Sequence, residues 1–104
     1  MEFVTTGKCM NTAERDVIIE LCRNNDVSMI GIFGSTARGE ASASSDLDLL
    51  VRFARPKSLL ALVRLERSLS EVLGRKVDLL TESAISPYLK DRILNELMVI
   101  YGTR

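Results

Sequence analysis

Residues Gly34 to Val51 read GSTARGEASASSDLDLLV and place a Gly-Ser pair ten residues before an Asp-x-Asp pair. The segment before this stretch, Val27 to Phe33 (VSMIGIF), is apolar and contains several β-branched residues, which predicts a strand that ends at Gly34. The segment from Asp46 to Phe53 (DLDLLVRF) predicts a second strand. Two strands, the first ending at a Gly-Ser pair and the second beginning with two acids, are therefore the feature around which the chain is organised.

The two aspartates, Asp46 and Asp48, should point to the same face of the second strand, roughly 7 Å apart, because a strand turns successive side chains to opposite faces. Two carboxylates side by side repel each other unless a cation lies between them or one of them is protonated. Mg²⁺ and Mn²⁺ prefer oxygen ligands, so the pair predicts a divalent metal site. The alternative, a solvated start of a strand, accounts for the carboxylates but not for the Gly-Ser pair before them. The opposite face of the strand is apolar and predicts core residues: Leu47, Leu49, Val51 and Phe53.

Four further residues are candidates for the same site. Gly34 either only breaks the first strand or lets the backbone approach a phosphate closely. Ser35 is predicted to start a short helix over 35–38, where unpaired N–H groups attract anions and the serine hydroxyl adds a donor. Arg38 either contacts a phosphate or lies exposed on that helix. Asp78 adds a third carboxylate on the same face if its strand neighbours the second strand; otherwise it is a solvated or helix-capping acid.

Helices and strands are predicted to alternate along the rest of the chain. Helices are expected over 12–25, 59–73 and 87–96, and strands over 76–81 and 98–101, the last with a helical continuation as the alternative. Gly74 suits the left-handed position after a helix, and Pro87 suits the first position of one. This order predicts an α/β (or α+β) fold, with a small mixed sheet flanked by helices in one domain over 1–104. Residues 1–10 lack periodicity and are interpreted as a loose tail.

Apolar residues spaced three or four apart predict the helix faces that turn to the core. In the helix over 59–73 they are Leu59, Leu62, Leu65, Leu69, Val72 and Leu73. In and after the helix over 87–96 they are Leu89, Ile93, Leu94 and Leu97.

Composition excludes several classes of protein and of site. With 104 residues, 46% of them hydrophobic, the chain can bury a single core, and its 14 basic and 14 acidic residues cancel, so neither nucleic-acid nor membrane binding is expected. No stretch approaches a transmembrane helix or a signal peptide, which predicts a cytoplasmic protein. Cys9 and Cys22 are too few for a disulfide framework, and Cys22 is expected to be a small core residue. Histidine is absent, which excludes a histidine base and a histidine-bearing zinc site.

The motif set resembles the DNA polymerase β-like nucleotidyltransferase superfamily. It consists of Gly34-Ser35, Asp46-x-Asp48 and the later strand acid Asp78. The sequences at 38–40 (RGE) and 45–51 (SDLDLLV) are similar to those of the minimal nucleotidyltransferases, the MntA-like antitoxins that accompany HEPN-domain ribonuclease toxins. The resemblance extends from the first helix to Tyr101.

The resemblance implies a nucleotidyltransferase fold and the transfer of AMP from ATP with release of pyrophosphate. It implies triphosphate contacts at Ser35 and Mg²⁺ or Mn²⁺ ligands at Asp46, Asp48 and Asp78. The chain ends soon after the third strand, so we expect no appended helical domain and a half-open site. A partner protein or a second subunit could supply the missing wall.

Three functions fit these expectations. The first is an enzyme that transfers AMP to a hydroxyl, expected to be that of a tyrosine, on a cognate HEPN toxin. The second is an antitoxin that neutralises its partner by occlusion alone, and the third is a nucleotidyltransferase for small molecules. The paired acids favour the first over the second, since occlusion does not need them, and the expectation that no helical domain is appended argues against the third.

Overall fold

The computed structural model describes residues 12–34 and 46–103. Residues 1–11, 35–45 and 104 are not described, so the tail expected over 1–10 and the short helix expected over 35–38 lie outside the described residues. The described elements are α1 (Thr12–Asn24), β1 (Val27–Phe33), β2 (Leu47–Phe53), α2 (Leu59–Leu73), β3 (Val77–Thr81), the 3₁₀ turn η2 (Glu82–Ala84), α3 (Pro87–Glu96) and β4 (Met98–Gly102). Each helix and strand that was predicted agrees with its range to within one residue at either end, η2 was not predicted, and β4 is a strand rather than a continued helix.

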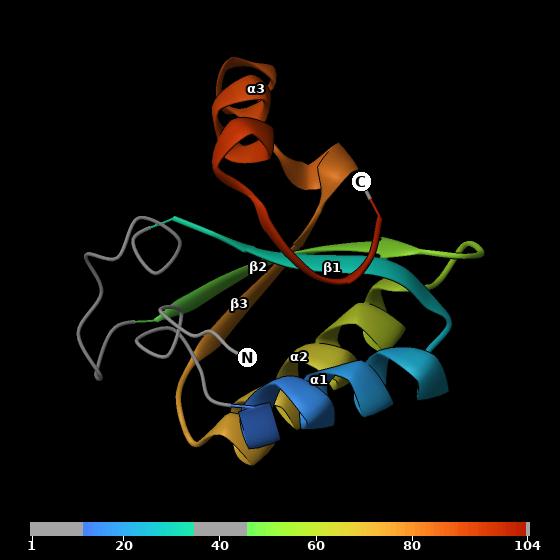
Figure 1. Ribbon diagram of the computed structural model, residues 1–104. Helices are drawn as coiled ribbons and strands as arrows, with labels where there is room; N and C mark the ends of the chain where they lie inside the picture. Colours follow the sequence, from blue (N-terminus) through green and yellow to red (C-terminus); the bar gives the residue numbers. More distant parts are fainter. Residues whose placement is uncertain (1–11, 35–45, 104) are drawn as a thin grey trace.

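The described strands form one mixed sheet in the order β3-β2-β1-β4 (Figure 1). β1 runs antiparallel to both of its neighbours, β2 and β4. β2 and β3 run parallel, and α2 makes the crossover between them. The predicted fold, a small mixed sheet flanked by helices, is confirmed.

The helices divide the molecule into layers. In Figure 1, α1 and α2 lie side by side against one face of the sheet, and α3 lies on the opposite side. The larger apolar cluster joins α1 and α2 to the sheet and contains the predicted core residues Leu47, Leu49 and Val51, with Phe53 partly buried against it. A smaller cluster joins α3 to the other face of the sheet and consists of Met29, Phe33, Leu50, Ile85, Ile93 and Leu97.

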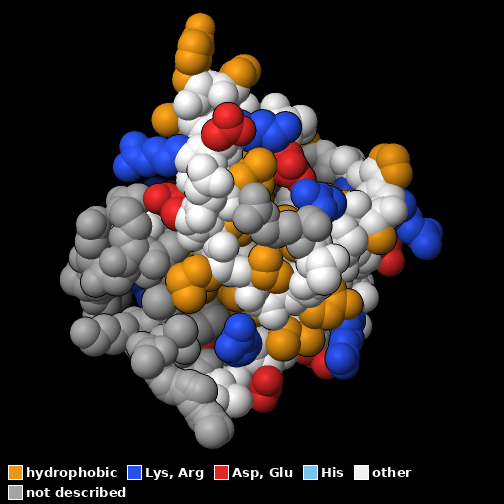
Figure 2. Space-filling model, turned by 45° about the horizontal axis from the view of Figure 1, so that its top comes forward, with side chains coloured by type: hydrophobic (Ala, Val, Ile, Leu, Met, Phe, Trp, Pro, Cys, Tyr) orange, Lys and Arg blue, Asp and Glu red, His pale blue; other side chains and the backbone are white. Residues whose placement is uncertain are grey.

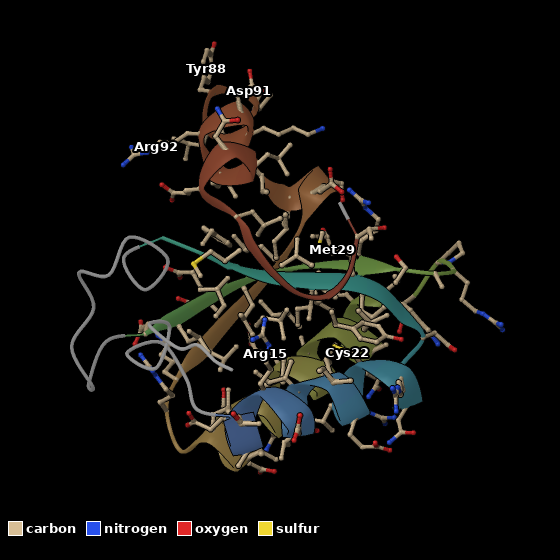
Figure 3. The ribbon with its side chains drawn as sticks, viewed as in Figure 1. Arg15, Cys22, Met29, Tyr88, Asp91 and Arg92 are labelled. Atoms are coloured by element: carbon tan, nitrogen blue, oxygen red, sulfur yellow. The ribbon has the colours of Figure 1, made fainter. Side chains whose placement is uncertain are left out.

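Cys22 confirms the expectation of a small core residue. Its side chain is fully buried on α1 in the larger cluster (Figure 3). Burial in apolar surroundings disfavours the thiolate and raises the pKa of the Cys22 thiol to about 12.

Local signals in the sequence set the helix ends. Ser58 accepts a hydrogen bond from the Ala61 backbone N–H at 3.2 Å and caps the start of α2. Gly74 follows α2 with a φ of 66°, and its N–H donates to the Ser70 carbonyl oxygen at 2.9 Å, as predicted for a left-handed cap. Pro87 occupies the first turn of α3.

Three residues predicted to face the core are substantially exposed. Leu59 and Val72 of α2 are 75% and 50% exposed, and Leu89 of α3 is 48% exposed. Leu59 is turned about 80° around the helix from the buried Leu69, because each residue adds about 100°. Leu89 is exposed because α3 projects outward from the sheet, so that its first turn stands clear of it, as the position of Tyr88 in Figure 3 shows.

The surface carries no strong separation of charge on the side seen in Figure 2, where Lys, Arg, Asp and Glu side chains are interspersed with apolar ones. Among the described residues, no helix combines the length and apolar character needed to cross a membrane.

Candidate active site

The predicted acidic residues lie where β2 and β3 begin. Asp48 pairs with Phe33 near the end of β1 and with Asp78 on β3. Register partners on neighbouring strands point to the same face, so the Asp48 and Asp78 carboxylates lie side by side on one face of the sheet. This is the face that carries α3, because Leu50, two residues after Asp48, belongs to the α3 cluster. The condition stated for Asp78, that its strand neighbours the second strand, is therefore met, while the role of Asp78 stays a prediction.

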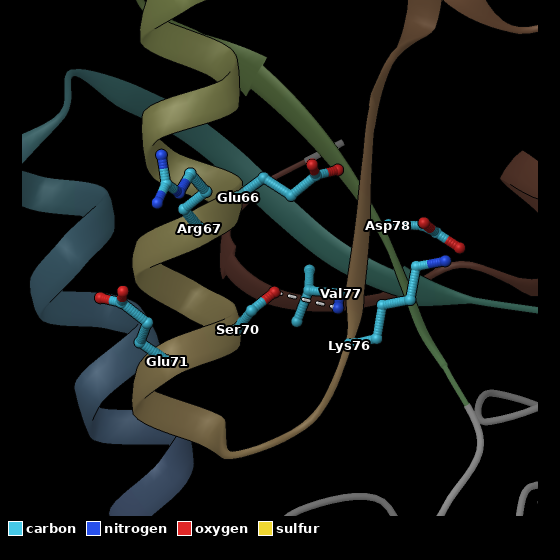
Figure 4. Close-up of a pocket in the computed structure, with 7 residues that line it drawn as sticks. All are labelled: Glu66, Arg67, Ser70, Glu71, Lys76, Val77 and Asp78. Carbon is cyan, nitrogen blue, oxygen red and sulfur yellow. Dashed lines mark hydrogen bonds between the residues drawn. The ribbon is translucent and has the colours of Figure 1, made fainter.

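Asp46 lies immediately before β2 and is exposed. Its Oδ2 atom is 3.9 Å from the Nζ atom of Lys76. Figure 4 shows Lys76 and Asp78 projecting from the same side of β3. A lysine thus lies beside Asp46, at the same end of the sheet as Asp78. Lys76 was not among the site residues predicted from the sequence, although its position two residues before Asp78 places it on the same face of the strand.

Gly34 ends β1 beside Asp48. Its φ is 78°, a conformation that glycine adopts readily and other residues rarely. A Cβ atom added here would clash with Oδ2 of Asp48 and would lie 3.3 Å from Asp48 Cγ. The Gly34 N–H donates a hydrogen bond to Oε1 of Glu96 at 3.1 Å. The sequence had suggested a strand break or a phosphate approach for this glycine; the structure adds that its missing side chain leaves room for the Asp48 carboxylate.

Two predicted nucleotide-binding residues, Ser35 and Arg38, lie outside the described residues. Their contacts with a triphosphate stay predictions, as do the roles of Gly34, Asp46, Asp48 and Asp78.

The donor set suits a magnesium or manganese ion in its chemistry, because every candidate ligand is a carboxylate oxygen. Among the described residues, however, no group of three or more His, Cys, Asp or Glu side chains is already arranged to hold a metal ion. Mg²⁺ usually binds through one or two carboxylates together with substrate phosphates. Asp46, Asp48 and Asp78 therefore fit a metal that arrives with a nucleotide better than one held by protein alone.

A shallow groove of about 260 Å³ lies between α2 and β3 (Figure 4). It is smaller than most small-molecule sites. Here α2 covers the free edge of β3: the Val77 N–H donates to Ser70 Oγ at 3.1 Å, and the Leu79 N–H donates to Glu66 Oε2 at 2.9 Å. These hydrogen bonds protect the edge of β3, since an uncovered strand edge can pair with another chain. The groove therefore marks the place where α2 covers the edge of the sheet.

Comparison with known proteins identifies related sequences. A family profile described as a nucleotidyltransferase domain matches residues 15–100. A candidate protein adenylyltransferase of Methanocaldococcus jannaschii is 54% identical over 79 residues, which cover 76% of this chain and 85% of that protein. The protein adenylyltransferase MntA of Thermococcus cleftensis is 40% identical over 81 residues, which cover 78% of this chain and 82% of that protein.

Solved structures show the same fold. A structure described as a candidate minimal nucleotidyltransferase matches with a TM-score of 0.74 and 40% identity, covering 83% of this chain and 88% of that chain. A chain of a toxin–antitoxin complex with AMP-PNP matches with a TM-score of 0.75 and 28% identity, covering 86% and 74%. A chain from the complex of a tri-AMPylated Shewanella oneidensis HEPN toxin with its MNT antitoxin matches with a TM-score of 0.70 and 26% identity, covering 90% and 74%.

Proposed function

Because the chain belongs to the family of nucleotidyltransferase domains, we propose that it transfers AMP from ATP to a tyrosine hydroxyl of a HEPN-domain toxin and so acts as an antitoxin. The observation that carries this proposal is the pairing of Asp48 with Asp78 on adjacent parallel strands, with Asp46 at the start of β2. The likeness to a complex of an AMPylated HEPN toxin with its antitoxin supports the acceptor class, and the likeness to a complex with AMP-PNP supports the nucleotide.

In the proposed reaction, the tyrosine oxygen attacks the α-phosphorus of ATP. A P–O bond to tyrosine forms, the bond between the α-phosphorus and the oxygen bridging to the β-phosphorus breaks, and pyrophosphate leaves. The hydroxyl proton passes to a carboxylate of the acidic set, since the sequence contains no histidine that could accept it.

The chain contributes chiefly by positioning. Asp48 and Asp78 are fixed relative to each other by the parallel pairing of β2 with β3, which removes freedom that the reacting groups would otherwise have to lose. A Mg²⁺ or Mn²⁺ ion held by Asp46, Asp48 and Asp78 would neutralise the phosphate charge when bound. Lys76 contributes a further positive charge beside Asp46.

The proposal is tested with the double variant Asp46→Asn, Asp48→Asn. Leu47, Leu49 and Val51 on the opposite face of β2 are untouched, so the variant should keep its fold and still bind the toxin. We expect AMP transfer, measured by intact-mass spectrometry of the toxin, to fall by roughly a hundred-fold or more, because charge stabilisation at the phosphate is lost. Growth rescue from the toxin should fail in parallel.

A matched control is Asp16→Asn, Asp91→Asn, which removes two exposed acids from α1 and α3 and changes the net charge equally. This control should transfer AMP as the parent does. If the site variant rescues growth as well as the parent and the toxin carries no AMP in either case, neutralisation is by occlusion and the enzymatic proposal is wrong.

A further inference from the structure

Glu96, the last residue of α3, reaches a turn that lies far away in the sequence. Its Oε1 atom accepts the backbone N–H of Gly34 at 3.1 Å, across 62 residues of chain. Glu96 is partly buried, and nothing in the sequence motif includes it. We propose that Glu96 is a positioning residue, which holds the Gly34 turn and through it the Asp48 carboxylate; the catalytic part of this inference rests on the function proposed above.

The Gly34 N–H, which is partly buried, lies beyond the β1–β4 ladder and has no partner within it. The last pair of that ladder joins Ile32 to Met98, and β4 begins at Met98. Backbone amides away from water are nearly always hydrogen-bonded, and a carboxylate makes a stronger acceptor than a neutral group. The Glu96 side chain therefore takes the place that a β4 backbone carbonyl would have for the residue directly after β1.

The last turn of α3 is itself held firmly against β1. Ile93 and Leu97, on either side of Glu96, are 8% and 9% exposed in the smaller core cluster. Gly31 of β1 allows this close approach: a Cβ atom added there would lie 2.8 Å from Leu97 Cδ1 and 3.0 Å from the Met98 carbonyl oxygen. Glu96 thus lies between two residues that pack in the core, not on a free helix end.

The consequence for the site follows from the contact between Gly34 and Asp48. The Asp48 carboxylate occupies the space that a side chain at Gly34 would fill. If the turn could shift at Gly34, the space for the Asp48 carboxylate would widen or narrow. A small displacement of a metal-binding carboxylate lowers the rate of phosphoryl transfer, because the reacting groups are then misplaced. The geometry therefore connects the end of α3 with the placement of a candidate metal ligand.

The test compares Glu96→Gln with Glu96→Ala, and Asn95→Ala serves as the control. Glutamine keeps an acceptor oxygen at the same reach, whereas alanine keeps none. Asn95 is an exposed neighbour on the same turn. Two readouts are taken: hydrogen exchange of the Gly34 amide by NMR in the full chain, and AMP transfer to the HEPN toxin with ATP and Mg²⁺.

We expect Glu96→Ala to lose Gly34 amide protection by about ten-fold or more and to lower kcat by roughly ten- to a hundred-fold with little change in the KM for ATP. Glu96→Gln should stay within about three-fold of the parent in both readouts, because it retains the hydrogen bond. Asn95→Ala should match the parent.

Each other outcome is decisive. If Glu96→Ala leaves Gly34 protected, Glu96 is not the acceptor that holds the turn, and the proposal is wrong. If Glu96→Gln loses as much as Glu96→Ala, an acceptor oxygen at this position is not sufficient to hold the turn, and the proposal as stated is also wrong. If Gly34 loses protection but kcat is unchanged, the contact is structural and Glu96 has no positioning role. If the parent itself transfers no AMP, the proposed function fails, while the exchange data still decide whether Glu96 holds Gly34.

Discussion

At the scale of single residues, Gly34 has three structural roles at the end of β1. Its positive φ ends β1, its N–H is held by Glu96, and its missing side chain leaves space for Asp48. A strand break was visible in the sequence because glycine followed an apolar run. The contacts with Glu96 and Asp48 were not, because they join residues that only the folded chain brings together.

Asp26, in the turn between α1 and β1, allows a prediction about pH. The pKa of its carboxyl is lowered, mainly by the hydrogen bond from Lys57 Nζ at 2.6 Å and by the Lys57 charge, with a smaller contribution from Arg55. A lowered pKa means that stability is present above the unfolded value of about 4 and is lost as the pH falls through the folded value.

We therefore expect Asp26→Asn to lower the melting temperature at pH 7 by no more than a few degrees, since the pair is exposed. The difference from the parent should disappear in strong acid, where the parent carboxyl is also protonated. Asparagine tolerates the φ of 57° at this position, so backbone strain should not contribute. Thermal melts between pH 7 and pH 2 check this, with Asp16→Asn as a charge-matched control. A difference that persists unchanged at the lowest pH would contradict it.

At the scale of elements, the bounds of helices and strands were predictable because their signals are local. Ser58 and Gly74 mark the ends of α2 through hydrogen bonds within one turn, and Pro87 marks the start of α3 through its fixed φ. The side-by-side placement of Asp48 and Asp78 was predictable only on the condition that β3 lies next to β2. The exposure of Leu89 was not predictable, because it depends on how α3 is tilted away from the sheet.

The packing of α3 on β1 gives an element-scale prediction. Gly31→Ala places a methyl group against Leu97 and the Met98 carbonyl oxygen, and neither can move freely, since Leu97 is buried and Met98 is paired in β4. We expect the free energy of unfolding to fall by about 1–3 kcal/mol, as for other overpacked sites. Urea denaturation measures this change, and amide exchange should show that protection is lost first in α3.

Gly74→Ala is the matched comparison. It adds the same methyl group where nothing lies within 4 Å, so its cost should come only from the left-handed φ of 66°, about 1 kcal/mol. Protection of α3 should not change in this variant. If both variants lose the same stability and α3 is unaffected in each, the close packing of Leu97 on Gly31 is not what holds the helix.

At the scale of the whole molecule, the residues of the larger core and the candidate site residues lie on opposite faces of the sheet. The larger cluster, which involves α1 and α2, holds one face, while the candidate acids lie on the other face at the end of the sheet where β1 stops and β2 and β3 begin. Substitutions among the acids should therefore change ligand binding with little effect on the fold.

This separation leads to a prediction about ligand-dependent stability. The carboxylates of Asp48 and Asp78 repel a triphosphate unless a divalent ion neutralises them, so ATP should stabilise the chain only together with Mg²⁺ or Mn²⁺. At a ligand concentration about one hundred times the Kd, binding contributes about 2.7 kcal/mol. For a domain of this size, that corresponds to a rise in melting temperature of roughly 10–20 °C.

Differential scanning fluorimetry with ATP and Mg²⁺, with ATP and excess EDTA, and with Mg²⁺ alone separates the contributions. Only the first mixture should raise the melting temperature by the full amount. The Asp46→Asn, Asp48→Asn variant should melt within a few degrees of the parent without ligand, because the apolar face of β2 is intact, and it should lose the rise with ATP and Mg²⁺. An equal rise in EDTA would show that the nucleotide binds without the metal. A large fall in the melting temperature of the ligand-free variant would show instead that the aspartates stabilise the strand, as the solvated-strand alternative requires.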